Sequence, residues 1–140
     1  MPKPPIRLLR IDHVVLRVRD LDRSLAFYRD VLGCPLELAR DELGLYQLRA
    51  GDSLIDLVTL DGPLGEAFPE PPAPHAPNVD HVCVQVADWD EPAIRAFLAE
   101  QGVEAGETGR RYGAQGFGPS IYLRDPNGNT VELKGPPEDG

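Results

Sequence analysis

The sequence IDHVVLRV, residues 11–18, recurs with a few substitutions as VDHVCVQV, residues 79–86. Each copy leads within a few residues into a segment whose apolar residues have helical spacing, 21–32 in the first case and 89–101 in the second. The copies are offset by 68 residues, about half the chain, which indicates a duplicated module. We therefore expect two related halves, each with a histidine as the third residue of its first strand.

The segments outside the repeat predict the same order of elements in both halves. Alternation of apolar and polar residues, rich in β-branched types, predicts a strand for each copy of the repeat. A glycine follows each predicted helix as a stop signal, Gly33 and Gly102. Further strands are expected at 36–40, 45–49 and 53–59, then near Val103, at 120–124 and at 130–134. Each half therefore has the order βαβββ, and the predicted class is α+β, with a curved mixed sheet that forms a cup.

A proline-rich stretch separates the halves. Residues 63–77 contain six prolines, a composition too stiff and polar for regular structure. We assign module one to residues 11–60, the linker to 61–78 and module two to 79–135. By length, the 140 residues form a single domain.

Composition and charge exclude several classes of partner. The formal net charge is -9, which argues against nucleic acid or an anionic membrane as the main partner, because both attract a basic face. The sequence contains no apolar run typical of a signal peptide or a membrane span. Two distant cysteines do not indicate a disulfide framework, so we expect a cytoplasmic protein with reduced thiols.

The period of two within a strand places the repeated histidines on matching faces. His13 shares a face with Val15 and Arg17, and His81 occupies the same position in module two. The face that carries Val14 is more apolar and should pack under the helix, so we expect the histidine side chains to point into the cup. Asp12 and Asp80 point away from it and are expected to bind backbone or helix N-termini.

Each half also contributes an acid from its last strand, Asp56 in module one and Glu132 in module two. Two histidines and two carboxylates suit one divalent ion, Mn²⁺, Fe²⁺, Co²⁺, Ni²⁺ or Zn²⁺, and the sequence does not choose among them.

The chain resembles the vicinal oxygen chelate, or glyoxalase/bleomycin-resistance/dioxygenase, superfamily over roughly residues 11–134. The resemblance rests on the two βαβββ halves that begin with Asp-His-Val and on RDPNGN at 124–129 before VEL at 131–133. It implies that His13, Asp56, His81 and Glu132 are the metal-binding positions. Glyoxalase I carries glutamate at the position of Asp56, so this shorter aspartate could reach the metal directly, reach it through water, or leave the other three residues as the ligands.

The resemblance also implies catalytic and substrate-binding residues. A metal that chelates two adjacent oxygens stabilises developing negative charge, and Glu132 or Asp56 can then act as the base. Tyr122, ten residues before Glu132, resembles the active-site tyrosine of extradiol dioxygenases. The acid–base histidine of those enzymes has no counterpart between Gly102 and Tyr122, which counts against ring cleavage. Tyr122, Arg17 and Arg124 are our candidates for substrate binding, and a guanidinium would suit an anionic substrate.

We therefore expect a metal-dependent lyase or isomerase of the glyoxalase type that acts on a small oxygen-bearing metabolite. The alternatives are an Fe(II) extradiol-type dioxygenase, a non-catalytic drug- or metabolite-binding resistance protein, and a transferase similar to fosfomycin-resistance enzymes. Members of the family commonly form dimers, so a homodimer is expected.

Overall fold

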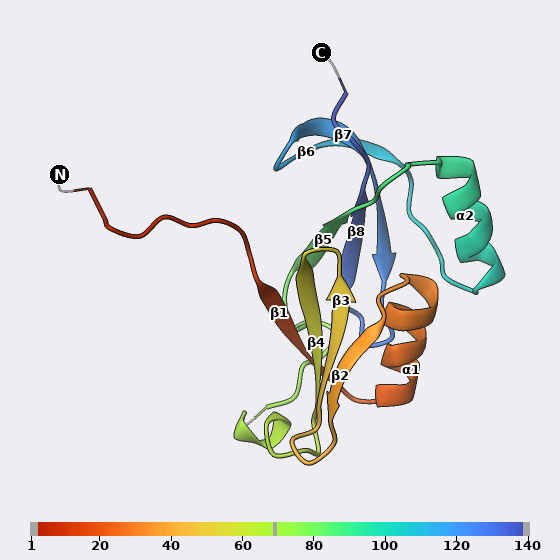
Figure 1. Cartoon of the computed structure of the whole chain (residues 1–140). Helices are drawn as coiled ribbons and strands as arrows, with labels where there is room; N and C mark the ends of the chain where they lie inside the picture. Colours follow the sequence, from red (N-terminus) through yellow and green to blue (C-terminus); the bar gives the residue numbers. More distant parts are fainter. Residues whose placement is uncertain (1–2, 69, 139–140) are drawn as a thin grey trace.

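The protein contains two four-stranded mixed sheets, one in each module (Figure 1). The computed structural model describes residues 3–68 and 70–138. The strand orders are β1-β4-β3-β2 and β5-β8-β7-β6, so the two halves have the same topology. In module one the strands are β1 (His13–Val18), β2 (Leu36–Arg40), β3 (Leu45–Ala50) and β4 (Ser53–Thr59). In module two they are β5 (His81–Gln85), β6 (Gly109–Gly113), β7 (Gly116–Arg124) and β8 (Thr130–Lys134). The predicted α+β class and the repeated βαβββ order are confirmed.

The first and last strands of each module are parallel neighbours, and the remaining pairs are antiparallel. In module one, Val15 lies opposite Asp56, and in module two Cys83 lies opposite Glu132. This register places each acid on the face of the sheet that carries the histidine of the same module.

A helix follows the first strand of each module. In module one, α1 (Leu21–Leu25) continues as the π-helical segment η1 (Ala26–Val31), and the Asp20 side chain caps its start. In module two, α2 (Glu91–Glu100) is capped in the same way by Asp90. A side-chain oxygen at this position satisfies an amide that has no partner within the helix.

The strand boundaries in module two differ from the prediction. No strand forms near Val103, where the chain makes only a bridge between Ala105 and Leu123. The edge strand is instead β6, and β7 begins at Gly116, four residues before the predicted start. The sequence of β6, GRRYG, lacks the apolar alternation that identifies a half-buried strand.

Both helices pack on one side of the sheets, and the two modules share one hydrophobic core (Figure 1). Leu16 and Leu57 of module one belong to the same buried cluster as Ile121 and Leu133 of module two. The opposite, polar faces of the sheets carry the histidines and acids. The expectation that the Val14 face packs under the helix is confirmed.

The linker between the modules contains the short 3-10 helix η2 (Gly65–Ala67). Asn78 lies at the end of the linker. Its side-chain oxygen accepts a hydrogen bond from the backbone amide of Arg17, and its side-chain nitrogen donates one to the backbone carbonyl of Arg17. Residues 3–12 extend away from the body as an arm whose apolar side chains are exposed (Figure 1). No helix among the described residues is long and apolar enough to cross a membrane.

Candidate functional site

The polar face of module two brings together a histidine, an acid and a tyrosine. Nε2 of His81 lies 3.4 Å from Oε1 of Glu132, and the Glu132 side chain is buried. Tyr122 lies opposite Glu132 across β7 and β8, and its ring meets the His81 ring edge-on at 5.9 Å between centroids. An imidazole nitrogen beside a buried carboxylate is a donor pair that suits a divalent transition metal ion.

Module one holds the matching pair, His13 and Asp56. Nε2 of Gln47 donates to Oδ2 of Asp56 at 3.1 Å, while Oδ1 of Asp56 is buried and has no hydrogen-bond partner among the described residues. A buried carboxylate oxygen without a partner is costly, and a cation would satisfy it. The side chains present on this face therefore fit a metal ion.

The aspartate that precedes each histidine holds its imidazole ring. Nδ1 of His13 lies 2.7 Å from Oδ1 of Asp12, and Nδ1 of His81 lies 2.6 Å from Oδ1 of Asp80. The expectation that these two acids bind backbone or helix N-termini was wrong, because both precede the first residue of their strand and can turn toward the neighbouring ring. The hydrogen bond to Asp12, followed by the charge of Asp56, raises the pKa of His13. Since Nδ1 is engaged, Nε2 is the nitrogen that remains for a metal.

One chain does not assemble the four predicted ligands into a single centre. Within residues 3–68 and 70–138, no three His, Cys, Asp or Glu side chains lie close enough together to hold one metal ion. The structure joins His81 with Glu132 and places His13 near Asp56, each pair on the polar face of its own module.

The predicted substrate-binding residues occupy different surroundings. Arg17 contacts the linker, since it donates to the carbonyl of Glu70 at 2.6 Å and its guanidinium lies 4.7 Å from the centre of the Phe68 ring. Arg124 is exposed and donates a long hydrogen bond, 3.4 Å, to the carbonyl of Gly128. Tyr122 carries the guanidinium of Arg111 over its ring at 4.3 Å.

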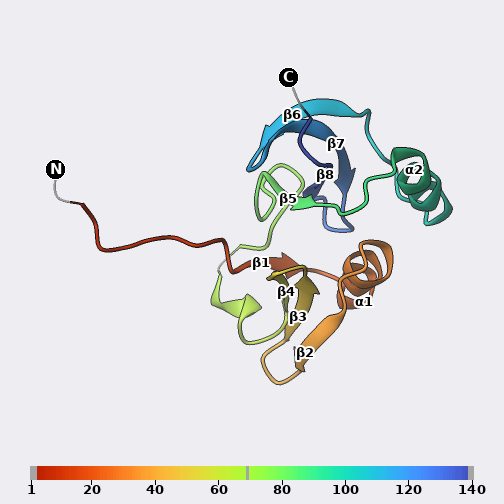
Figure 2. The same cartoon turned by 45° about the horizontal axis from the view of Figure 1, so that its top comes forward.

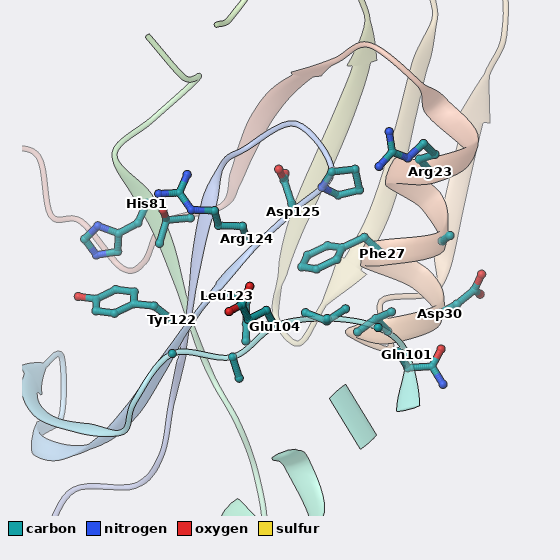
Figure 3. Close-up of a pocket in the computed structure, with 18 of the residues that line it drawn as sticks. Arg23, Phe27, Asp30, His81, Gln101, Glu104, Tyr122, Leu123, Arg124 and Asp125 are labelled. Atoms are coloured by element: carbon teal, nitrogen blue, oxygen red, sulfur yellow. The ribbon is translucent and has the colours of Figure 1, made fainter. Parts of the chain in front are cut away.

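An open groove of about 1050 Å³ runs between η1 and module two (Figure 3). His81, Tyr122 and Arg124 lie toward one end of it, and Arg23 and Asp30 toward the other. Glu132 and Asp56 do not line it. The groove thus reaches the edge of the polar face of module two and places Arg124 beside that edge.

Comparison with known proteins identifies the family. The model of the Glyoxalase/Bleomycin resistance protein/Dioxygenase superfamily matches residues 10–133. The chain belongs to this superfamily.

Relatives in the superfamily carry different activities. The chain is 31% identical to a glutathione transferase FosA of Serratia marcescens over 126 residues, 90% of this chain and 80% of the relative. It is 28% identical to a catechol-2,3-dioxygenase of Bacillus subtilis over 124 residues, 88% of this chain but only 40% of that enzyme. The crystal structure of a lactoylglutathione lyase from Agrobacterium tumefaciens superposes with a TM-score of 0.67 at 25% identity, covering 92% of this chain and 95% of the other. Membership of the superfamily therefore does not select one reaction.

Two further side chains, those of Cys83 and Lys134, lie on the polar face of module two. Desolvation, followed by the charge of Glu132, raises the pKa of the Cys83 thiol to about 11, so Cys83 is protonated at neutral pH and is a poor nucleophile. Lys134, which our sequence reasoning passed over, lies two residues after Glu132 on β8 and is buried. The period of two along VELK would have placed it on the face of Glu132.

Proposed function

We propose that this protein is a metal-dependent lyase or isomerase of the glyoxalase type, with its metal centre completed between two copies of the chain. The observation that carries the proposal is the matched donor pairs on the two modules, together with the unpartnered Oδ1 of Asp56. His13 and Asp56 of one copy would hold the ion with His81 and Glu132 of the partner subunit.

A second copy is the simplest way to unite the pairs. The duplication makes the two polar faces equivalent, so a two-fold axis can bring module one of each copy against module two of the other. Val15 and Leu38, on the same face as Asp56, are about half exposed in the single chain. The arm adds exposed Ile6, Leu8, Leu9 and Ile11. Clusters of exposed apolar side chains commonly mark a protein–protein interface.

The chemistry of the face favours proton transfer. A divalent cation bound there would act as a Lewis acid toward two adjacent oxygens of a substrate. Glu132 is buried, lies beside His81 and is directed onto the polar face, so its carboxylate is positioned to accept a proton from the carbon next to a carbonyl. Tyr122 and Arg124, at the end of the groove, would orient the rest of the substrate.

Ring cleavage receives less support from the same face. Among the described residues, module two has no histidine besides His81, so the face lacks a second imidazole for acid–base work beside Tyr122. The lactoylglutathione lyase among the structural relatives supports the lyase class, whereas the similarity to the dioxygenase covers less than half of that enzyme.

The test combines metal analysis with a proton-exchange assay. Untagged protein is analysed for bound metals and incubated in D₂O with a panel of hemithioacetals, 2-hydroxy acids and 2-oxo acids. We expect bound Ni, Co, Zn or Mn and metal-dependent exchange of a carbon-bound hydrogen, which Glu132→Gln abolishes and the exposed control Glu100→Gln leaves unchanged. Bound iron with oxygen consumption on catechols would instead establish a dioxygenase, thiol addition to a phosphonate epoxide a transferase, and absence of any metal binding a binding protein.

A further inference from the structure

Lys134 is a buried cation on β8. The residue is only 4% exposed, and within the described part of the chain Nζ makes a single hydrogen bond, 3.3 Å long, to the carbonyl of Gly116. Among the residues that the structure describes, no acid forms an ion pair with it. A buried charge is normally paired, because a neutral carbonyl recovers little of the lost hydration.

Arg111 lies on the same face and also lacks an acidic partner in the described part of the chain. It donates to the backbone oxygen of Ser120 at 2.9 Å and to the Ser120 hydroxyl at 2.7 Å, and its guanidinium stacks over Tyr122. Ser120 lies directly opposite Lys134 across β7 and β8, and it is fully buried. Arg111 and Lys134 therefore flank Ser120 on one face of the sheet.

Glycines on β6 and β7 provide the space for these cations. A Cβ atom at Gly109 would lie 2.6 Å from the guanidinium carbon of Arg111. A Cβ atom at Gly118 would lie 3.1 Å from Nζ of Lys134, and one at Gly113 would lie 3.1 Å from its Cε. Figure 2 shows β6 and β7 arching over the end of β8, where Lys134 lies. The small residues therefore leave room for the two cationic side chains on this face.

We propose that Lys134, Arg111 and the Ser120 hydroxyl form a subsite for an oxyanion group of the substrate, a carboxylate, phosphate or phosphonate. The proposal rests on the function proposed above and adds the substrate class: a small metabolite with metal-chelating oxygens at one end and an oxyanion at the other. Lys134 follows Glu132 by two residues, which corresponds to about 7 Å along a strand. That spacing selects a short molecule, and a planar guanidinium matches the geometry of an oxyanion.

The other described groups on this face leave room for an anion beside the two cations. Gln85 and Cys83 on β5 are neutral, and Glu132, the acid on this face among the described residues, lies beside His81. Arg110, next in sequence to Arg111, lies on the other face of β6 over the Phe117 ring at 4.5 Å, so it offers a control of equal charge.

The experiment is calorimetric titration of the metal-free, full-length protein with inorganic phosphate, methylphosphonate and malonate. We expect saturable binding of at least one probe, and the probe that binds most tightly identifies the oxyanion. Lys134→Met and Arg111→Met should each weaken that binding at least tenfold, while Arg110→Gln should leave it unchanged. Lys134→Met should also raise the melting temperature of the free protein, because it removes an unpaired buried charge; a purely structural lysine would lower it.

Two further measurements separate this proposal from the metal-centre proposal. His81→Ala should retain anion binding, and Lys134→Met should retain metal binding. If the wild-type protein bound no metal, this result would overturn the proposed function and not the anion subsite. No saturable binding of any of the three anions, or equal binding by the wild type and both Met variants, would overturn the subsite.

Discussion

The hydroxyl of Tyr28 donates a 2.6 Å hydrogen bond to Oδ2 of Asp125, and the two residues belong to different modules. Tyr28 lies on η1 beside the core, and Asp125 begins the turn between β7 and β8, where it also accepts from the amides of Asn127 and Asn129. Both side chains are buried. This bond joins the modules within one chain, and in that packing the two candidate metal-binding pairs remain apart.

Tyr28→Phe is expected to destabilise the protein by about 1.5–3 kcal/mol, because a buried carboxylate loses a charge-assisted hydrogen bond. Urea denaturation measures the change. Tyr112→Phe is the control, since the Tyr112 side chain is 73% exposed, and it should change the free energy of unfolding very little. Equal stability of the Tyr28→Phe variant and the wild type would show that the bond does not hold the modules together.

The same tyrosine predicts an alkaline limit to stability. Burial, followed by the charge of Asp125, raises the pKa of Tyr28 well above its usual value of 10.0. Above pH 10 the unfolded chain therefore loses a proton that the folded chain retains, so stability falls with pH, by about 1.4 kcal/mol per pH unit. The free energy of unfolding of Tyr28→Phe should lack this component, and its deficit relative to the wild type should shrink between pH 10 and 11. A constant deficit across that range would contradict the assignment.

A mixing experiment tests whether the metal centre is shared between copies. His13→Ala and His81→Ala variants should each lose metal when alone. After joint unfolding and refolding, half of the dimers are mixed and each mixed dimer has one intact centre, so about a quarter of the wild-type metal content should return. Sedimentation equilibrium confirms the dimer. If the four ligands came from a single chain, the mixture would recover no metal.

The sequence was sufficient for the topology because a duplicated βαβββ pattern constrains strand order, helix placement and the faces of His13 and His81. It was not sufficient for the edge strand of module two, since GRRYG has no apolar alternation and its glycines lie against the side chains of Arg111 and Lys134. It also could not show whether the pairs meet, because that depends on contacts between modules such as Tyr28 with Asp125. The interaction of Asp80 with His81 was missed for a local reason: alternation of faces does not apply to the residue just before a strand.

Asp80 is expected to position the His81 ring for metal binding. Asp80→Ala should lower metal affinity by about 10- to 100-fold, since a carboxylate on Nδ1 fixes the tautomer and orientation of a ligating imidazole. His81→Ala should have a larger effect. A competition titration with a chromogenic chelator measures both, and Asp52→Ala, in the exposed turn before β4, is the control. Affinity equal to that of the wild type would mean that the exposed carboxylate does not restrain the ring.

Asp56→Asn separates a metal ligand from a structural acid, because the two roles predict opposite changes in stability. Oδ2 of Asp56 accepts a hydrogen bond from Gln47, while Oδ1 is buried without a partner in the described chain, and a buried polar atom without a partner costs free energy. The neutral amide keeps an acceptor for Gln47 and removes the charge. We therefore expect the metal-free variant to be about 1–2 kcal/mol more stable than the wild type. Its metal affinity should fall as far as that of Glu132→Gln, since each substitution removes one carboxylate ligand. Thermal unfolding with and without added metal gives both quantities, and a destabilised variant with unchanged metal affinity would assign Asp56 to the core of module one.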